Sequence, residues 1–238
     1  MDRSLRSEYL QAMGIRQWVP RDRVRETAVA GQLPAGAEAV IPGPAGQRAN
    51  AIAGLDWEQL ESSVADCTRC ALAETRTRTV FGVGNREADW LIIGEAPGVD
   101  EDRQGEPFVG RAGQLLTQML RAIGYRREDV YITNILKCRP PGNRDPLPGE
   151  VACCHDYLER QIALAGPGLI LAVGRIAAHN LLQTDIPVGR LRGLVHYYGK
   201  HRIPLVVTYH PAYLLRSPLE KRKAWADLQL AQQVFRGQ

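Results

Sequence analysis

The sequence predicts an α/β fold with a mainly parallel, four-stranded sheet that helices cover on both faces. Short apolar runs recur at 90–94, 130–133, 169–173 and 204–209, and each is too continuously apolar for a strand with one face in water. Segments with helical periodicity separate these runs, which is the pattern of strands joined by crossover helices. Strands buried on both faces require a layer of helices on each side.

The helices are predicted from apolar spacing and from the residues that begin them. Asp56 is a candidate N-cap for a helix that carries Trp57, Leu60 and Val64 on one face. A turn-rich stretch with a short strand at 194–198 precedes the last long strand. The remaining helices are expected at 112–123, 148–164, 175–182 and 219–235.

The first 56 residues differ in composition from the rest. Residues 1–25 form a basic amphipathic segment whose apolar side chains are spaced for one or two helical turns. Residues 26–56 consist largely of Ala, Gly and Pro with few charges, a composition typical of a flexible linker. We therefore expect the globular domain at 57–238, with the first segment as a tethered docking peptide.

Composition restricts the class of protein. The apolar fraction is 45%, yet no apolar stretch is as long as a membrane span. The N-terminus is charged and lacks the apolar segment of a secretory signal, so we expect a cytoplasmic protein and no membrane partner, and we expect a monomer. The net charge of +4, with basic residues gathered in the C-terminal third, fits either a nucleic-acid-binding face or solvated helix surfaces.

Four of the five cysteines are spaced like metal ligands. Cys67 and Cys70 form a Cys-x2-Cys pair, and Cys138 and Cys154 follow. In a reducing compartment such a set is first a candidate metal site. All-thiolate ligation leaves a zinc ion or an iron–sulfur cluster, and the uneven spacing, with Cys138 in a Pro/Gly loop, favours the cluster. The competing interpretation treats the cysteines as small packed hydrophobes.

Three polar residues, Glu95, Asn134 and His210, each come directly after an expected strand. Because the carboxyl ends of parallel strands meet at one edge of a sheet, we expect them to converge on one site. The planar amide of Asn134 can match the edge of a base, and a neutral His210 can donate a hydrogen bond to a developing anion. Each residue also has an ordinary alternative role as a cap or a loop hydrogen-bonding partner.

Two further segments add apolar candidates. Phe108 lies between turn residues, where it either plugs the core or stacks on a planar ligand. Leu214 and Leu215 lie on an expected exposed loop, where they either pack against the last helix or act as a wedge that enters a base stack.

Four motifs occur in a fixed order along the chain. They are Glu95-Ala96-Pro97-Gly98 with Glu101-Asp102, Pro107-Phe108-Val109-Gly110-Arg111-Ala112-Gly113, Thr133-Asn134 with Lys137-Cys138-Arg139-Pro140-Pro141-Gly142-Asn143-Arg144, and His210-Pro211-Ala212-Tyr213-Leu214-Leu215-Arg216. Together with the cysteine spacing, over residues 57–236, they resemble the family 4 uracil-DNA glycosylases. The resemblance implies a three-layer α/β/α sandwich, uracil-containing DNA as substrate and a [4Fe-4S] cluster as cofactor.

The resemblance also implies the cluster ligands and the roles of the pocket residues. The fourth ligand of the family lies three residues before an aromatic-Leu pair, which selects Cys154 over its neighbour Cys153. The implied cluster ligands are Cys67, Cys70, Cys138 and Cys154. In the implied pocket, Phe108 stacks on the flipped uracil, Asn134 reads its Watson–Crick edge, Glu101 stands near C5, His210 donates to O2, and Ala96 and Pro97 complete the substrate site.

Two further roles concern the attacking water and the space that the flipped base leaves. Ala96 stands where the family 1 enzymes place an aspartate that positions the water, so Glu95 is the nearest candidate for that task. Leu214 or Leu215 would fill the space that the flipped base leaves. The residues expected to face the DNA backbone are Arg139, Arg144 and Arg216.

Two alternatives concern function and partners. A non-catalytic iron–sulfur protein for redox sensing or electron transfer would use the same cysteines but would leave Phe108, Asn134 and His210 without a shared purpose. Residues 9–18 are similar to the N-terminal peptide of the psi subunit of bacterial DNA polymerase III, which docks on the clamp loader. That similarity implies a clamp-loader subunit as partner, with Trp18 as the anchor, and the alternative is a helix folded back on the enzyme's own surface.

Overall fold

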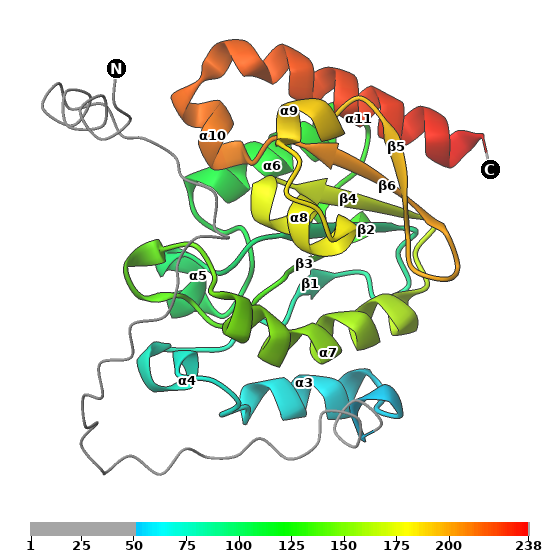
Figure 1. Cartoon of the computed structure of the whole chain (residues 1–238). Coiled ribbons are helices and arrows are strands. Elements are labelled where there is room, and N and C mark those ends of the chain that lie inside the picture. The colour runs from blue at the N-terminus through cyan, green and yellow to red at the C-terminus, as the bar shows by residue number, and fades with distance from the viewer. Residues whose placement is uncertain (1–50, 238) are drawn as a thin grey trace, which may run out of the picture. The chain divides into compact units, whose positions relative to one another are not determined.

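The structure, a computed structural model, describes residues 51–237. Six strands form one sheet in the order β1-β3-β2-β4-β6-β5 (Figure 1). The four inner strands are parallel: β3 (Tyr131–Asn134), β2 (Trp90–Gly94), β4 (Leu169–Val173) and β6 (Ile203–Thr208). The short strands β1 (Val83–Gly84) and β5 (Val195–Tyr198) pair antiparallel at the two edges. The predicted α/β class and parallel sheet are confirmed. The short strand expected at 194–198 joins the sheet as β5, and β1 is an edge strand that was not predicted.

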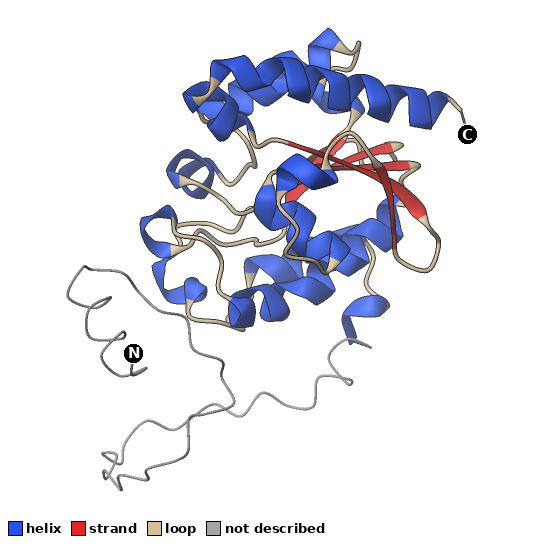
Figure 2. Cartoon of the chain, turned by 45° about the horizontal axis from the view of Figure 1, so that its top comes forward, coloured by secondary structure: helices blue, strands red, loops and turns tan. Residues whose placement is uncertain are grey.

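Helices cover both faces of the sheet, as predicted (Figures 1 and 2). The longer helices are α3 (Trp57–Ala65), α6 (Arg111–Ala122), α7 (Pro148–Ala165), α8 (Arg175–Leu182) and α11 (Lys221–Arg236). The shorter ones are α4 (Leu72–Thr75), α5 (Val99–Gln104), α9 (Val188–Leu191) and α10 (Pro211–Arg216), with 3-10 turns η2 (Arg127–Asp129), η3 (Pro141–Asn143) and η4 (Pro218–Glu220). None of the helices within 51–237 has the length and apolar character needed to cross a lipid bilayer.

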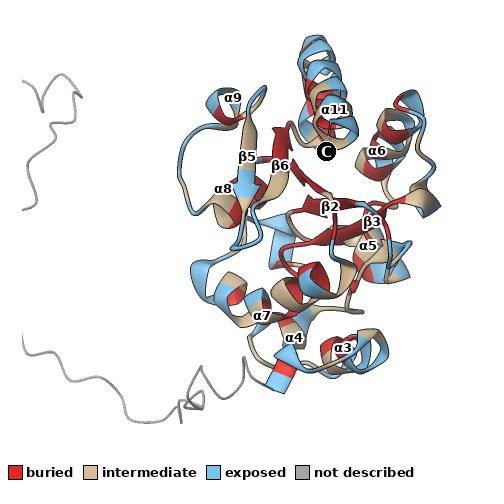
Figure 3. Cartoon of the chain, turned by 90° about the vertical axis from the view of Figure 1, so that its right-hand side faces the viewer, coloured by how far each residue is buried: buried red, intermediate tan, exposed pale blue. Residues whose placement is uncertain are grey.

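Each face of the sheet has its own apolar core, and the inner strands β2, β3 and β4 are buried along their whole length, whereas β5 at the edge is not (Figure 3). Alternation along β2 places Trp90 and Ile92 in the cluster with α6 and α11, whereas Leu91 and Ile93 join the cluster with α7 and α8. All four side chains are at most 1% exposed. This two-sided burial explains why the strand sequences are apolar throughout.

A third apolar cluster packs α3 and α4 against α7 and includes two of the predicted ligands, Cys138 and Cys154. The predicted N-cap is confirmed, since the Asp56 carboxylate accepts the Gln59 backbone N–H at 2.9 Å. Ile52 is buried in this cluster, so packing begins before the expected domain boundary at residue 57. The predicted docking segment 1–25 and the linker up to residue 50 lie outside the described residues.

Candidate active site

The carboxyl ends of the parallel strands open on one cavity of about 820 Å³. Strand direction brings Glu95 from the end of β2, Asn134 from β3 and His210 from the end of β6 to its wall, together with Phe108 from the loop before α6. The predicted convergence is therefore seen in the structure. The other predicted site residues that line this cavity are Ala96, Pro97, Glu101, Arg144 and Arg216.

Gly94 lets the amide of Asn134 and the ring of Phe108 approach the end of β2. Gly94 pairs with Asn134 across the sheet. A Cβ atom on Gly94 would lie 2.4 Å from Asn134 Oδ1 and 2.5 Å from Phe108 Cζ, closer than atoms can pack. Asn134 is buried, and its Oδ1 has no hydrogen-bond partner within residues 51–237. A buried amide oxygen without a partner is costly, so it indicates a polar ligand in the cavity.

Phe108 has a backbone conformation that its loop imposes. Its φ angle is +55°, in the left-handed region that bulky residues rarely adopt. Glu101 organises this loop, because its carboxylate accepts the backbone N–H groups of Gly98, Val109 and Gly110 at 3.0–3.1 Å. These contacts give Glu101 a role in positioning Phe108. The predicted place of Glu101 beside C5 of uracil stays a prediction.

His210 is held with a defined tautomer. Its Nδ1 accepts the Ala212 backbone N–H at 3.1 Å and so caps α10. An amide N–H can only donate, so Nδ1 carries no hydrogen and the neutral ring carries it on Nε2. Burial, followed by the charge of Arg216, lowers the pKa of His210 to about 4, against a smaller opposing effect of Glu101. At neutral pH the ring is uncharged, and Nε2–H is the hydrogen bond donor that it can offer the cavity.

The rings of His210 and Phe108 lie beside each other. Their centroids are 5.7 Å apart and their planes are tilted by 30°. Gly174 permits this position of His210, because a Cβ atom on Gly174 would lie 2.8 Å from His210 Cβ. An aromatic face and a neutral donor thus share one wall of the cavity.

Glu95 is a carboxylate with an altered acidity. Burial raises the pKa of Glu95 to about 6; Asp145 adds to this shift and Arg175 opposes it. Arg175 and Asp145 are themselves paired at 2.6 Å. A carboxyl group that titrates near neutral pH is suited to accept a proton from water. This property agrees with the predicted task of Glu95, which no contact in the structure tests.

The residues predicted to face the DNA backbone have varied surroundings. Arg144 makes a two-point pair with Glu150, at 2.9 and 2.5 Å, and Arg139 donates to Asn143 at 2.7 Å. The Glu150 carboxylate thus neutralises part of the positive charge of Arg144. Both Arg144 and Arg216 line the cavity.

The expectation of an exposed loop at Leu214 and Leu215 was wrong, because both lie in α10. This helix contacts α6, and Leu214 is only 1% exposed, whereas Leu215 is 37% exposed. Pro211 in the first turn and the His210 cap start a helix that is too short to show periodicity in the sequence. Of the two predicted wedge residues, Leu215 is the one at the surface.

Several lining residues were not predicted. Gly174 and Arg175 follow β4 as Glu95 follows β2, so the rule that identified Glu95 applies to them as well. Tyr209 and Tyr213, one residue before and three residues after His210, also line the cavity. The residues of α9 that line the cavity, Val188 and Gly189, belong to a four-residue helix without a recognisable pattern.

Comparison with known proteins agrees with this geometry. The family model described as the uracil DNA glycosylase superfamily matches residues 81–229. The chain belongs to the uracil-DNA glycosylase superfamily. It is 46% identical over 177 residues to the type-4 uracil-DNA glycosylase of Archaeoglobus fulgidus, covering 71% of this chain and 88% of that one. Its identity to the Thermotoga maritima type-4 enzyme is 45% over 163 residues, which cover 67% of this chain and 83% of the relative. These matches confirm the predicted family and the predicted enzyme class, a uracil-DNA glycosylase.

In this superfamily member all five cysteines line one small cavity, which Val64, Leu72 and Tyr157 help to enclose. None of them forms a disulfide. Burial raises the pKa of Cys70, Cys138 and Cys154, to about 12 for Cys154, and neighbouring cysteines add to each of these shifts. Sulfur atoms whose negative charges would oppose one another need a compensating cation before they can ionise together.

Two hydrogen bond donors are aimed at the sulfur atoms. Arg76 donates to Sγ of Cys138 at 3.2 Å, and the Lys137 backbone N–H donates to Sγ of Cys154 at 3.4 Å. Cys153 differs, because its Sγ donates to the Arg69 carbonyl at 3.3 Å. Cys154 Sγ thus accepts a hydrogen bond, whereas Cys153 Sγ donates one.

Lys137 joins the cysteine cavity to the base of the active site. Its side chain is fully buried, and Nζ donates to Thr133 Oγ1 at 2.6 Å, to the Asn134 carbonyl at 2.8 Å and to Gln161 Oε1 at 2.6 Å. Three acceptors match the three donors of an ammonium group. Lys137, the residue before Cys138, thus binds the end of β3, which carries Asn134.

Proposed function

We propose that this protein flips uracil out of DNA, hydrolyses its N-glycosidic bond and releases free uracil, leaving an abasic site. The observation that carries this proposal is the wall on which the Phe108 ring, the unpaired Oδ1 of Asn134 and the neutral Nε2–H donor of His210 come together. The rival function, redox sensing or electron transfer, would give these three side chains no common task.

The cavity supplies groups for recognising the base. Uracil stacks on the face of Phe108, and the amide of Asn134 pairs with its Watson–Crick edge through one donor and one acceptor. Asn134 is preorganised for this, since it is buried and its backbone carbonyl is bound by Lys137. The small residues Ala96 and Pro97 leave room for the base against the backbone.

His210 serves the bond-breaking step. When the C1′–N1 bond breaks, its electron pair moves to uracil, and negative charge develops on O2 while positive charge develops on the sugar. The Nε2–H of His210 donates to O2 and stabilises this anion without transferring its proton. A preorganised donor of this kind contributes about 3 kcal/mol to transition-state stabilisation.

Glu95 serves the second step. A water oxygen forms a bond to C1′ as the carboxylate of Glu95 takes one of its protons. Glu95 then releases this proton to solvent, and the uracil anion takes a proton from solvent at N1. The balance is one water consumed, with one uracil and one abasic sugar formed. The sequence places no aspartate at Ala96, so Glu95 is the carboxylate that the end of β2 offers for this task.

Uracil release tests the proposed function. The full chain is incubated with a labelled single strand that contains one deoxyuridine, free uracil is measured by chromatography, and abasic sites are measured by alkaline strand cleavage. Equal amounts of free uracil and abasic sites are expected, and a strand with thymine in the same place should remain intact. Absence of free uracil at stoichiometric enzyme would overturn the proposal.

Acid is expected to slow the reaction through Glu95. Because its pKa is about 6, the rate should fall as the pH decreases through 6, and Glu95→Gln should lose this dependence together with about a hundredfold in rate, the lower end of what a general base contributes. Single-turnover rates between pH 5 and 8 measure both effects. An unchanged rate in Glu95→Gln would remove this carboxylate from the mechanism.

The stability of the same variant provides a control. A carboxyl group whose pKa is raised in the folded state destabilises the fold once it ionises, that is, as the pH rises through about 6. Glu95→Gln should therefore melt at a higher temperature than the wild type at pH 8 and at the same temperature near pH 4.5. A gain of stability with a loss of rate would separate catalysis from folding.

The cofactor that fits the cysteine cavity is a [4Fe-4S] cluster held by Cys67, Cys70, Cys138 and Cys154. Within 51–237 no three His, Cys, Asp or Glu side chains meet as a single metal ion requires. A four-iron cluster is larger than one ion and takes each cysteine at a separate iron, which suits sulfur donors spread around one cavity. The cluster would supply a structural link between the segment that joins α3 to α4, the Cys138 loop and α7. Cys153 takes no part.

DNA approaches along the rim of the cavity. Leu215 and Arg216 lie on α10, and Arg139 and Arg144 follow Cys138 in the chain, where they would contact phosphates. Leu215 enters the stack in place of the flipped base. A monomeric state and a cytoplasmic location remain predictions.

Residues 9–18 would dock on a clamp-loader subunit, with Trp18 as the anchor. Deleting residues 1–25 should then leave uracil release unchanged, since the catalytic groups all lie within 95–210, and should abolish binding to purified clamp-loader subunits. Trp18→Ala in the full chain serves as the matched variant and should weaken binding alone. A deletion that lowers the rate or the melting temperature would instead indicate that the segment packs on its own enzyme.

A further inference from the structure

The cavity is larger than one base requires. Its volume of about 820 Å³ lies within the range of ~300–1,000 Å³ that accommodates drug-sized ligands, whereas a pyrimidine ring is much smaller. Tyr209 and Tyr213 line this cavity together with the uracil-binding groups. The proposed chemistry assigns neither tyrosine a role.

The two tyrosines form a ring pair with an open face. Their centroids are 5.0 Å apart and their planes are tilted by 44°. Tyr213 nevertheless remains 36% exposed, so much of its ring is available to a ligand. Arg216, three residues after Tyr213 on the same helix, also lines the cavity, so the pair lies beside a residue predicted to contact the DNA backbone.

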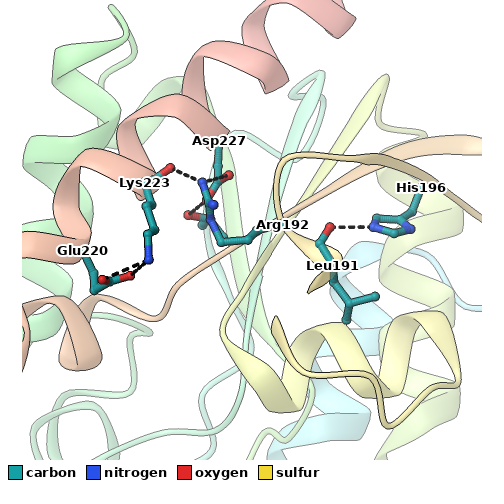
Figure 4. A network of polar contacts seen from close by, with 7 residues as sticks. Leu191, Arg192, His196, Glu220, Lys223 and Asp227 are labelled. Carbon is teal, nitrogen blue, oxygen red and sulfur yellow. Dashed lines mark hydrogen bonds and ion pairs between the residues drawn. The ribbon is translucent and has the colours of Figure 1, made fainter. Parts of the chain in front are cut away.

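Arg192 contacts the ring of Tyr209 through a cation–π interaction. Its guanidinium carbon lies 5.6 Å from the Tyr209 ring centroid. Figure 4 shows Arg192 reaching from the loop after α9 to Asp227 on α11, where Nε and Nη2 donate to the carboxylate at 3.1 and 2.8 Å. Asp227 is fully buried and also accepts the Thr208 hydroxyl at 3.0 Å. The guanidinium is therefore held by Asp227, and it lies against the Tyr209 ring.

We infer that Tyr209 and Tyr213 form a stacking platform for an unpaired nucleobase that neighbours the flipped uracil in the same strand. The inference rests on the proposed function and extends it to the substrate. Every nucleobase has a π face, so such a platform accepts any neighbouring base. A paired neighbour stays stacked inside the duplex, which makes single-stranded or locally opened DNA the favoured substrate.

Fluorescence tests the contact without requiring catalysis. The probe is a short single strand with a tetrahydrofuran abasic analogue at the uracil position and 2-aminopurine beside it, on the 5′ side in one strand and on the 3′ side in the other. Binding to the wild type should change 2-aminopurine emission in one of the two strands through stacking on the tyrosines. Tyr213→Phe should retain the change and Tyr213→Ala should lose it. Equal signals in wild type and Tyr213→Ala, with both proteins bound, would overturn the inference.

Kinetics tests the same contact in the reacting complex. Tyr213→Ala should raise KM for a uracil-containing single strand about tenfold, as loss of one base–aromatic stack predicts. Replacing the neighbouring base of the substrate by an abasic spacer should raise KM of the wild type by a similar factor and should add little in Tyr213→Ala. If KM of Tyr213→Ala with the spacer substrate instead rises by the product of the two separate factors, the tyrosine and the base do not interact.

A tyrosine elsewhere on the surface provides the matched control. Tyr197 on β5 is 51% exposed and lines a different cavity, so Tyr197→Ala should leave both emission and KM at wild-type values. The outcomes also separate this inference from the proposed function. If the wild type releases no uracil, the proposed function fails, whereas uracil release with unaltered 2-aminopurine emission contradicts the platform alone.

Discussion

Replacing His210 with alanine is expected to slow uracil release about a hundredfold to a thousandfold, the effect of removing one donor to a developing anion. The reason is specific to this ring: with Nδ1 used as the cap of α10, Nε2–H is the donor left for uracil O2. Single-turnover excision with enzyme in excess measures the loss. A wild-type rate in His210→Ala would remove His210 from the mechanism.

His210→Asn separates catalysis from capping. Asparagine is among the best N-cap residues, so it should restore the bond to the Ala212 N–H and most of the stability, about 1 kcal/mol, that alanine loses. Its shorter amide does not replace Nε2–H in the cavity. We therefore expect His210→Asn to melt near the wild-type temperature and to react as slowly as His210→Ala. Recovery of the rate together with stability would show that His210 acts only as a cap.

Replacing Cys138 with alanine is expected to remove nearly all bound iron and most of the soluble yield. Its sulfur is one of the thiols around the cavity between α4 and α7, and loss of one ligand leaves the others as buried groups whose charges oppose one another. Iron content per chain and the visible absorbance of the purified protein measure the effect. Wild-type protein that binds zinc and lacks visible absorbance would contradict the cluster assignment.

Cys153→Ala is the matched control, since it removes the adjacent thiol on the same helix. Its Sγ donates to a carbonyl, so iron content should stay near that of the wild type. Cys154→Ala should lose iron as Cys138→Ala does, because Cys154 Sγ accepts a backbone N–H inside the cavity. A colourless Cys153→Ala beside a coloured Cys154→Ala would reverse the ligand assignment.

The sequence predicts those parts of this protein that depend on local pattern. Continuous apolar strands indicated the parallel sheet, and strand direction alone placed Glu95, Asn134 and His210 at one edge. The two-residue strand β1 and the four-residue helix α9 escaped prediction because elements so short show no periodicity.

Contacts through space explain what the sequence did not predict. Lys137 lies two residues before Arg139 at the start of a Pro/Gly-containing stretch and resembles a surface lysine, but folding buries it among Thr133, Asn134 and Gln161. Glu101 was predicted as a group facing the base, and only the folded loop reveals that it accepts three backbone N–H groups. Such roles depend on partners brought close by tertiary packing.

The central claim is that the wall formed by Phe108, Asn134 and His210 binds uracil. A crystal structure of the full chain with free uracil tests it most directly. The expected complex has uracil stacked on Phe108, its Watson–Crick edge on the Asn134 amide and its O2 within hydrogen-bond distance of His210 Nε2. Uracil bound at another site, or bound here with O2 turned away from His210, would contradict the claim.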